Sequence, residues 1–382
     1  MTGAGTVSSR SLTAVDPMLL LTGLLLIAVG LIAISSASIE YGDWHFQNSW
    51  HHTQRHLLYI CIALSAGLIV YRVPPQFWLD TGWVWLFLAL ALLVLVLVPG
   101  IGKNVNGSQR WLPLGPFTLQ PSEFAKLALV IYLAGYLVRQ EHEVRNEWQG
   151  FVKPMAVLGS VAILLMVEPD FGATVIAVAT AFGMLFLAGV KLGHFAVVLV
   201  VSFAGLLGLI YSAPYRVARL TAYTDPWADP FGSGFQLIQS LIAFGRGQWF
   251  GVGLGNSVQK LFYLPEAHTD FVFSIWAEET GFIGALFVIA LYAALIGRVL
   301  WVARRATVQG DTFGSYICFG VALIFSGQAF VNMGVSSGLL PTKGLTLPFI
   351  SYGGSSLIMC CCMLAMVLRI EQGLAATSRG AR

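Results

Sequence analysis

The feature that most constrains this chain is a series of apolar runs, each about 20 residues long, that recurs along almost its whole length. An α-helix of about 20 residues spans the hydrocarbon core of a bilayer. The runs do not alternate apolar and polar residues, as the strands of a membrane barrel would. Only 10% of the 382 residues are charged, whereas a soluble domain carries about 25%. The chain is therefore an integral membrane protein, all-α and polytopic.

The apolar runs predict ten transmembrane helices in a single domain. The predicted helices cover residues 17–36, 56–71, 82–98, 122–138, 154–167, 171–190, 193–211, 271–297, 313–335 and 352–368. We expect residues 1–16 to form an N-terminal tail, 17–370 the transmembrane domain and 371–382 a C-terminal tail.

The distribution of Lys and Arg residues orients the chain, because cytoplasmic loops carry an excess of both. With both termini in the cytoplasm, 12 of the 21 Lys and Arg residues lie inside, 8 lie outside and Lys126 lies within the membrane. The short inside loop that carries Arg298, Arg304 and Arg305 supports this orientation. The loops between spans three and four, seven and eight, and nine and ten then face outside.

The loop between spans seven and eight, residues 212–270, is far longer than a simple connection. Loops longer than about 15 residues are usually functional or disordered, and this one is too rich in aromatic residues for disorder. Gly and Pro residues mark a turn region at 225–234. The apolar residues of 235–244 have the spacing of an amphipathic helix that lies at the interface. We therefore predict a large extracytoplasmic loop that carries function.

Asp270 stands where this loop leads into the eighth span, directly before the apolar residues FVFSIW. One interpretation is an N-cap, because Asp accepts backbone N–H bonds at helix starts. Glu278 and Glu279 follow on the same span, however, and three carboxylates are more than capping explains. A charge at membrane depth is costly unless it is paired or hydrated, so such residues are candidate functional groups. Asp270 is the leading candidate for catalysis.

Other polar residues near the outer face have both a structural and a functional interpretation. Glu123 and Lys126 are spaced i, i+3, so they can form a neutral pair that fixes packing or face a substrate. Arg110, next to Trp111, is either an interfacial anchor or a guanidinium that binds a lipid phosphate. Asp170 is expected to cap the sixth helix.

The last outside loop, between spans nine and ten, is rich in Gly, Pro and hydroxyl residues and cannot form a regular helix. Irregular backbone at membrane depth is buried in protein or lines a wet cavity, where Lys343, Ser355 and Ser356 would place polar groups. Gln328 and Asn332, one turn apart on the ninth span, form a polar stripe that is typical of helix–helix contacts. All five cysteines lie in apolar segments without a metal-binding spacing, so we expect them to serve in packing and not in a metal or redox site.

Four segments are specific enough to indicate a family. They read NGSQRWLPLGPFTLQPSEFAKL, EPDFGATV, LPEAHTDFVFSIWAEETG and GLLPTKGLTLPFISYGGSS. Together and in this order they resemble the SEDS family (shape, elongation, division and sporulation), from the first span to the tenth. The form LLPTKGLTLP of the last outside loop is similar to the division members of that family, whereas elongation members usually carry LP followed by valines.

The resemblance implies a multi-pass peptidoglycan glycosyltransferase of the bacterial cytoplasmic (inner) membrane, located at the division septum. It would polymerise lipid II, an undecaprenyl-diphosphate-linked disaccharide pentapeptide, and release undecaprenyl diphosphate. The essential aspartate of the family falls on Asp270. Besides lipid II and membrane lipids, the implied partners are a class B penicillin-binding protein (a transpeptidase of the FtsI type) and divisome regulators of the FtsQ, FtsL, FtsB and FtsN type. No nucleic acid is expected.

The implied chemistry suits these residues. The 4-hydroxyl of the acceptor sugar loses a proton as it attacks the anomeric carbon of the donor, and one carboxylate within hydrogen-bond reach can take that proton. Direct displacement inverts the α-linked donor, and the leaving diphosphate needs cations more than a general acid. A divalent cation, Mg²⁺ or Mn²⁺, is a candidate cofactor. The candidate substrate-binding residues are Arg110, Glu123, Lys126, Asp170, Arg216, Arg246, Lys260, His268, Lys343 and Ser355.

Three other functions are compatible with this pattern. The first is a flippase for lipid II, because ten helices with intramembrane charges suit a transporter. Transporters place their sites near the midplane of the bilayer, however, whereas the polar motifs here cluster on the outer face. The others are a polymerase for cell elongation and a scaffold without catalytic activity that recruits the transpeptidase.

Overall fold

The computed structural model describes residues 15–105, 108–115, 117–211, 223–341 and 344–380. Its long helices are α1 (Pro17–Phe46), α2 (His51–Arg72), α3 (Pro75–Leu97), α4 (Pro121–Arg139), α6 (Trp148–Val167), α7 (Phe171–Leu187), α8 (Leu192–Tyr211), α11 (Val272–Val308), α12 (Thr312–Ser336) and α13 (Gly354–Gly380). The shorter helices are α5 (Glu141–Asn146), the 3-10 helix η1 (Pro226–Ala228) and α10 (Phe235–Gly247). The candidate residues Arg216 and Lys343 lie outside the described residues.

These helices confirm the predicted all-α, polytopic membrane fold. Within the described ranges, 8 helices are long and apolar enough to cross a membrane. Helix α7 is a shorter apolar helix of 17 residues, and α8 is an apolar helix of 20 residues. Each of these long helices overlaps one predicted span, in the predicted order. The amphipathic helix that we predicted at 235–244 is present as α10.

Several helices are longer than predicted, because an apolar run marks only the apolar part of a helix and misses the turns that continue it with polar or small residues. Helix α1 continues to Phe46 rather than ending at residue 36, and its small residues Ser36, Ala37, Ser38 and Gly42 are buried. Helices α11 and α13 likewise extend past the predicted ends, to residues 308 and 380. Most of the segment that we expected as a C-terminal tail, 371–382, is therefore helical.

Helix α6 begins before Pro154, which we had placed at its start, and carries this proline in its interior. A proline removes one backbone N–H and so frees the carbonyl four residues earlier. Here that carbonyl belongs to Gly150, and the Tyr136 hydroxyl of α4 donates to it at 2.8 Å. A side chain from the neighbouring helix thus satisfies the freed group, as burial in a membrane protein requires.

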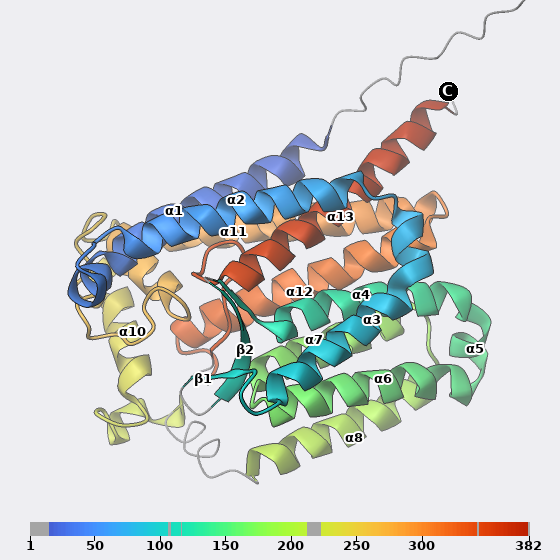
Figure 1. Cartoon of the computed structure of the whole chain (residues 1–382), viewed down its shortest axis with the longest axis horizontal. Helices are drawn as coiled ribbons and strands as arrows, with labels where there is room; N and C mark the ends of the chain where they lie inside the picture. Colours follow the sequence, from blue (N-terminus) through green and yellow to red (C-terminus); the bar gives the residue numbers. More distant parts are fainter. Residues whose placement is uncertain (1–14, 106–107, 116, 212–222, 342–343, 381–382) are drawn as a thin grey trace, which may run out of the picture.

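The long helices lie lengthwise beside one another, whereas α10 crosses one end of the bundle (Figure 1). The start of α1 and the end of α13 lie together at the opposite end. Two ion pairs are found at that end, Arg298 with Asp16 at 2.5 Å and Arg305 with Glu371 at 3.0 Å. An even number of spans predicts this placement of the two ends of the domain.

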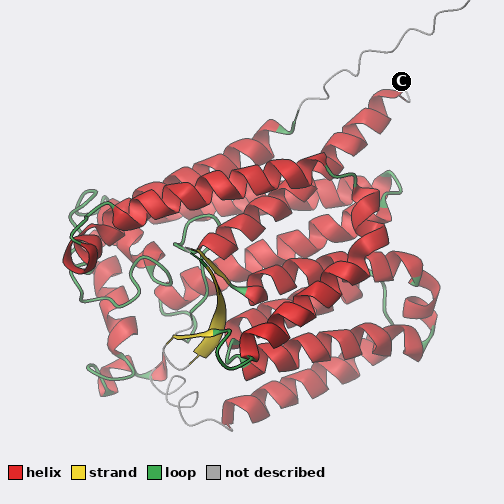
Figure 2. Cartoon of the chain, viewed as in Figure 1, coloured by secondary structure: helices red, strands yellow, loops and turns green. Residues whose placement is uncertain are grey.

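A small sheet that the sequence pattern did not predict occupies the loop between α3 and α4. Strands β1 (Lys103–Val105), β2 (Ser108–Leu114) and β3 (Phe117–Leu119) pair antiparallel in the order β1-β2-β3. Figure 2 shows these strands among the helices, at the same end of the bundle as α10. The sheet positions Arg110 in β2, beside the helix starts that follow.

Candidate active site

Asp270 lies in the last turn before α11, and the residue is half-buried. The N-cap of α11 is Phe271, which makes no side-chain cap hydrogen bond. The interpretation of Asp270 as an N-cap is therefore wrong. The position of Asp270 is therefore not explained by capping of α11.

Three consecutive backbone carbonyls hold the Asp270 segment against α12 and the loop between α12 and α13. The His268 oxygen accepts from the backbone N–H of Tyr352 at 3.1 Å, and the Thr269 oxygen accepts from the Ser351 hydroxyl at 2.6 Å. The Asp270 oxygen accepts from the side-chain amide of Asn332 at 2.9 Å. The fold thus fixes Asp270 through its main chain.

The carboxylate of Asp270 lies against Gly344 in the loop between α12 and α13. A Cβ atom added to Gly344 would come within 2.7 Å of Asp270 Oδ2, which is shorter than real Cβ contacts. A larger residue at position 344 would therefore force the Asp270 carboxylate to shift. The predicted irregular outer loop is therefore one wall of the site around Asp270.

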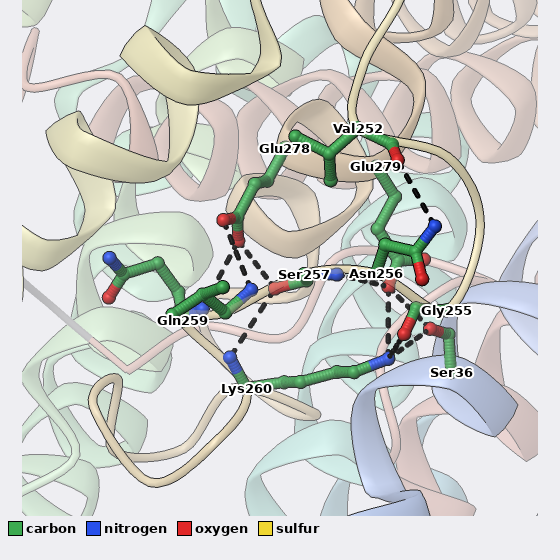
Figure 3. A network of polar contacts seen from close by, with 10 residues as sticks. Ser36, Val252, Gly255, Asn256, Ser257, Gln259, Lys260, Glu278 and Glu279 are labelled. Atoms are coloured by element: carbon green, nitrogen blue, oxygen red, sulfur yellow. Dashed lines mark hydrogen bonds and ion pairs between the residues drawn. The ribbon is translucent and has the colours of Figure 1, made fainter.

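Glu278, two turns further along α11, is fully buried and bound by the loop that precedes α11 (Figure 3). Its carboxylate accepts from the Ser257 hydroxyl and from the backbone N–H groups of Val258 at 3.2 Å and Gln259 at 3.3 Å. Arg246 Nε lies 3.4 Å from Glu278 Oε1, and the arginine side chain remains 42% exposed. Arg246 is thus a candidate cation that is both paired and accessible.

Glu279 is bound in the same network by groups from two other parts of the chain (Figure 3). Ser36 of α1 donates to it at 2.5 Å, and Lys260 Nζ lies 3.2 Å from Glu279 Oε1. Lys260 also donates to the Ser36 hydroxyl at 3.1 Å and to the Gly255 carbonyl at 2.6 Å. With 7% of its surface exposed, Lys260 is committed to this buried ion pair, which favours a structural role over phosphate binding.

Helix α11 is broken directly after these two glutamates. Gly281 has φ 70° and ψ −167°, outside the helical region, which glycine adopts without a Cβ clash. The break frees the carbonyls of Glu278 and Glu279, and they accept from the backbone N–H groups of Val252 and Gly253 at 3.0 Å each. The loop before α11 therefore fills the break.

Arg110, in β2, binds the turn between α6 and α7. Its guanidinium donates to the carbonyl of Glu168 at 3.1 Å and to that of Pro169. Asp170 caps α7 as predicted, accepting from the Ala173 N–H at 3.2 Å and from the Ser122 hydroxyl at 2.9 Å. The contacts of Asp170 are those of the predicted cap, whereas Arg110 holds the turn between α6 and α7, which is a structural role other than the interfacial anchor that we considered.

Glu168, between these two residues, is fully buried, and neither carboxylate oxygen has a hydrogen-bond partner among the described residues. Burial and the nearby carboxyl of Asp170 raise the pKa of Glu168 to about 8. The side chain is therefore largely protonated at neutral pH.

Glu123 and Lys126 form the predicted neutral pair on α4. Lys126 Nζ lies 2.8 Å from Glu123 Oε1, and both side chains are buried. Ser355 joins α13 to the start of α4, because its hydroxyl donates to the Thr118 carbonyl at 3.2 Å and accepts from the Gln120 N–H at 3.0 Å. Glu123, Lys126 and Ser355 thus make structural contacts within and between the helices.

His268 lies in a cluster of aromatic rings from α1, α2 and α13's preceding loop. Its ring centroid is 5.1 Å from that of His52, 5.4 Å from Tyr41 and 5.7 Å from Tyr352. Burial lowers the pKa of His268 to about 4. At neutral pH this residue is an uncharged hydrogen-bonding group two positions from Asp270.

The structure thus separates the candidates that the sequence grouped together. Asp270 and His268 lie in the segment that contacts the loop between α12 and α13, whereas Arg246 of α10 is paired with Glu278, two turns further along. Sequence reasoning did not single out Gly344 and Ser351, and it interpreted Asn332 only as a helix–helix contact. The signal that pointed toward them was the Gly-, Pro- and hydroxyl-rich composition of that loop.

Similarity to known proteins extends over almost the whole chain. Residues 16–375 match the FtsW/RodA/SpoVE family of cell cycle proteins. The chain is 52% identical over 355 residues to the probable peptidoglycan glycosyltransferase FtsW of Hahella chejuensis, covering 93% of this chain and 89% of that protein. It is 50% identical over 348 residues to the protein of the same name from Pseudomonas fluorescens, covering 91% and 86%.

Solved structures share the fold as well. One, described as "Structural coordination of polymerization and crosslinking by a peptidoglycan synthase complex", superposes with a TM-score of 0.74 at 29% identity and covers 94% of this chain and 98% of its own. The rod shape determining protein RodA of Thermus thermophilus gives a TM-score of 0.69 at 27% identity, covering 94% and 97%. From its motifs, its fold and these similarities, the chain belongs to the FtsW/RodA/SpoVE family of cell cycle proteins, the SEDS family.

Proposed function

We propose that this protein is a peptidoglycan glycosyltransferase that polymerises lipid II, with Asp270 as the general base. The observation that carries the proposal is the placement of Asp270, a half-buried residue whose carboxylate lies against Gly344 while its backbone is bound to α12. A base must be held rigidly and still meet its substrate. The relatives named as peptidoglycan glycosyltransferases FtsW support the same activity.

The proposed reaction is one direct displacement. The acceptor 4-hydroxyl oxygen forms a bond to the anomeric carbon of the donor as the bond from that carbon to the diphosphate breaks. The hydroxyl proton passes to Asp270, and the electron pair leaves with undecaprenyl diphosphate. Attack from the face opposite the leaving group inverts the anomeric configuration from α to β.

We propose Arg246 as a cation that stabilises the leaving diphosphate, since its side chain is 42% exposed and is oriented by Glu278. Arg216 and Lys343 remain candidates for the same role on the basis of the sequence. The described residues contain no cluster of three or more His, Cys, Asp or Glu side chains that would hold a metal ion. A divalent cation that assists the reaction would then take its ligands from the diphosphate and water as well.

A role in septum formation, rather than elongation, is supported by relatives of about 50% identity that are named FtsW, against 27% identity to RodA. We propose that the protein acts in the inner membrane with both termini in the cytoplasm. We also propose that it works with a class B penicillin-binding protein and with divisome regulators. The structural relative from a peptidoglycan synthase complex supports a partnership with a crosslinking enzyme.

Transport of lipid II is the less favoured function. Transporters commonly use broken helices whose unpaired backbone groups bind the cargo, and α11 is broken at Gly281. Here the carbonyls of Glu278 and Glu279 at the break are already paired with Val252 and Gly253. The backbone groups at the break are therefore hydrogen-bonded within the protein, whereas a transporter would need them open to its cargo.

The experiment that tests the proposal is polymerisation of purified lipid II by the protein together with its transpeptidase partner. We expect glycan strands from the wild type and a loss of about 10²- to 10⁴-fold or more in the Asp270→Ala variant, the usual contribution of a general base. Normal polymerisation by folded, partner-bound Asp270→Ala protein would overturn the assignment of the base. Translocation of lipid II in liposomes without any polymer would favour transport.

A further inference from the structure

Asn332 links the two segments that form the site. It lies on α12 with 1% of its surface exposed. Its side-chain nitrogen donates to the Asp270 carbonyl at 2.9 Å and to the Leu345 carbonyl at 2.6 Å. A carboxamide nitrogen carries two N–H groups, so both are used. The two acceptors belong to different segments, the start of α11 and the loop between α12 and α13.

These two carbonyls lie on either side of the contact between the Asp270 carboxylate and Gly344. One belongs to Asp270 itself, and the other belongs to the residue after Gly344, which the carboxylate touches. The ties from Ser351 and Tyr352 reach Thr269 and His268 instead. One amide group therefore ties the backbone of Asp270 to the backbone of the loop that its carboxylate faces.

The same face of α12 carries a natural control, Gln328, one turn before Asn332. Gln328 is fully buried, and neither of its side-chain polar atoms has a hydrogen-bond partner among the described residues. The Asn332 side-chain oxygen likewise has none within the described part of the chain. The two amides thus share burial and helix face, and the two donated bonds of Asn332 are what distinguish it.

We propose that Asn332 is a positioning residue whose carboxamide fixes Asp270 relative to the loop at Gly344 and Leu345. This inference rests on the proposed function, in which Asp270 is the base. The effect on catalysis follows from geometry, because a displacement of about 1 Å at a reacting group costs up to about 10²-fold in rate. Asn332 acts through Asp270 and does not itself contact the reacting atoms.

The test compares three variants in the lipid II polymerisation assay with the transpeptidase partner. Asn332→Leu is similar in size and has no donors, and we expect kcat to fall about 10- to 30-fold with KM within about twofold. Asn332→Asp keeps the shape but turns an acceptor toward two carbonyl oxygens, so its loss should be at least as large. Gln328→Leu removes a buried amide without such bonds and should stay within about twofold of wild type.

A second measurement separates positioning from general packing. Hydrogen–deuterium exchange of residues 266–272 and 344–350 should rise in both Asn332 variants and stay at the wild-type level in Gln328→Leu. Equal losses in the Asn332 and Gln328 variants, or wild-type rates and exchange in Asn332→Leu, would overturn the inference. If Asn332→Leu does not fold, Asn332→Ser, which keeps one donor, replaces it. We then expect a smaller fall in kcat and a smaller rise in exchange.

The two proposals fail in different ways. If the wild type makes no polymer, the proposed function fails, and the exchange measurement still decides whether Asn332 holds the two segments together. If the wild type is active, Asp270→Ala is inactive and the Asn332 variants are normal, only the positioning role is wrong.

Discussion

The two ends of the first helical segment of α11 use carboxylates in opposite ways. At its start, Asp270 is half-buried, its backbone is bound to α12 and its carboxylate lies against a glycine. Two to three turns later, the carboxylates of Glu278 and Glu279 are buried and bound to groups of α1, α10 and the long loop. A residue that is only half-buried can meet a substrate, whereas the fully buried carboxylates of Glu278 and Glu279 hold the fold together.

This contrast shows that a charged residue within the membrane does not by itself indicate a catalytic role. All three residues satisfy the rule that a charge at membrane depth marks a functional group. Lys260 and Glu279 neutralise each other in the interior, where one partner without the other is strongly unfavourable. The rule therefore identifies residues that need a reason to be there, and only the contacts decide whether that reason is catalysis or assembly.

The sharpest test of the contrast measures activity and stability for one variant at each end of the segment. Asp270→Asn should reduce the polymerisation rate by about 10²-fold or more. It should change the thermal unfolding temperature little, because the amide has the same shape as the carboxylate. Glu279→Gln should lower the free energy of unfolding by about 3–5 kcal/mol, because it leaves the Lys260 charge buried without its partner. Thermal unfolding in detergent and the polymerisation assay measure both.

The comparison breaks if the two variants change the same quantity. A matched control is the pair Lys260→Met with Glu279→Gln, which removes the buried charge and should recover much of the lost stability. If the double variant is as unstable as Glu279→Gln alone, the network does not stabilise the protein through this ion pair.

The break in α11 gives the next largest effect. Gly281→Ala should destabilise the protein by about 1–3 kcal/mol or more, because the residue has φ 70° and its new Cβ would lie 2.4 Å from the backbone nitrogen of Gly251. The control is Gly297→Ala in the same helix, where a Cβ meets nothing within 4 Å. It should be neutral or stabilise by about 0.5–1 kcal/mol. Thermal unfolding of the two variants measures this difference. Equal stabilities would contradict the tight packing of the loop into the break at Gly281.

Gly344→Ala tests the contact at the other end of the segment. The added methyl group would lie 2.7 Å from Asp270 Oδ2, so the carboxylate must shift and polymerisation should fall by about 10-fold or more. Gly353→Ala in the same loop makes only an ordinary contact, 3.4 Å to Thr346, and should keep activity within about twofold. Comparable activity in both variants would show that the position of Asp270 does not depend on Gly344.

Glu168 provides the smallest and most local test, a buried carboxyl without a partner among the described residues. Its pKa in the folded protein is about 8, raised from 4.5 by burial, so the folded state binds the proton more tightly than the unfolded state. Stability from this group is fully present below pH 4.5 and is lost as the pH rises through about 8. Glu168→Gln should flatten this dependence and stabilise the protein by about 1 kcal/mol or more above pH 8. Unfolding measured from pH 5 to 9 tests it, and unchanged pH dependence would contradict the raised pKa.

Part of the site was predictable because its contacts are local in the chain. Glu123 and Lys126 lie three positions apart on one helix, and their spacing alone places them in reach of each other. Asp170 precedes a helix start and caps it within three residues. By contrast, Ser36 reaches Glu279 across 243 positions, and Asn332 reaches Asp270 across 62. No periodicity or spacing in the sequence encodes such distances.

The sequence alone determined the membrane class, the order of the ten long helices and the family, because hydropathy and extended motifs are properties of contiguous residues. It also marked Asp270 as a residue that needs an explanation. Only the tertiary structure decided which carboxylates are paired, that α11 is broken at Gly281 and that Asp270 lies against Gly344. The physical reason is that these features depend on which distant segments the bundle brings within 3 to 4 Å, where hydrogen bonds and ion pairs act.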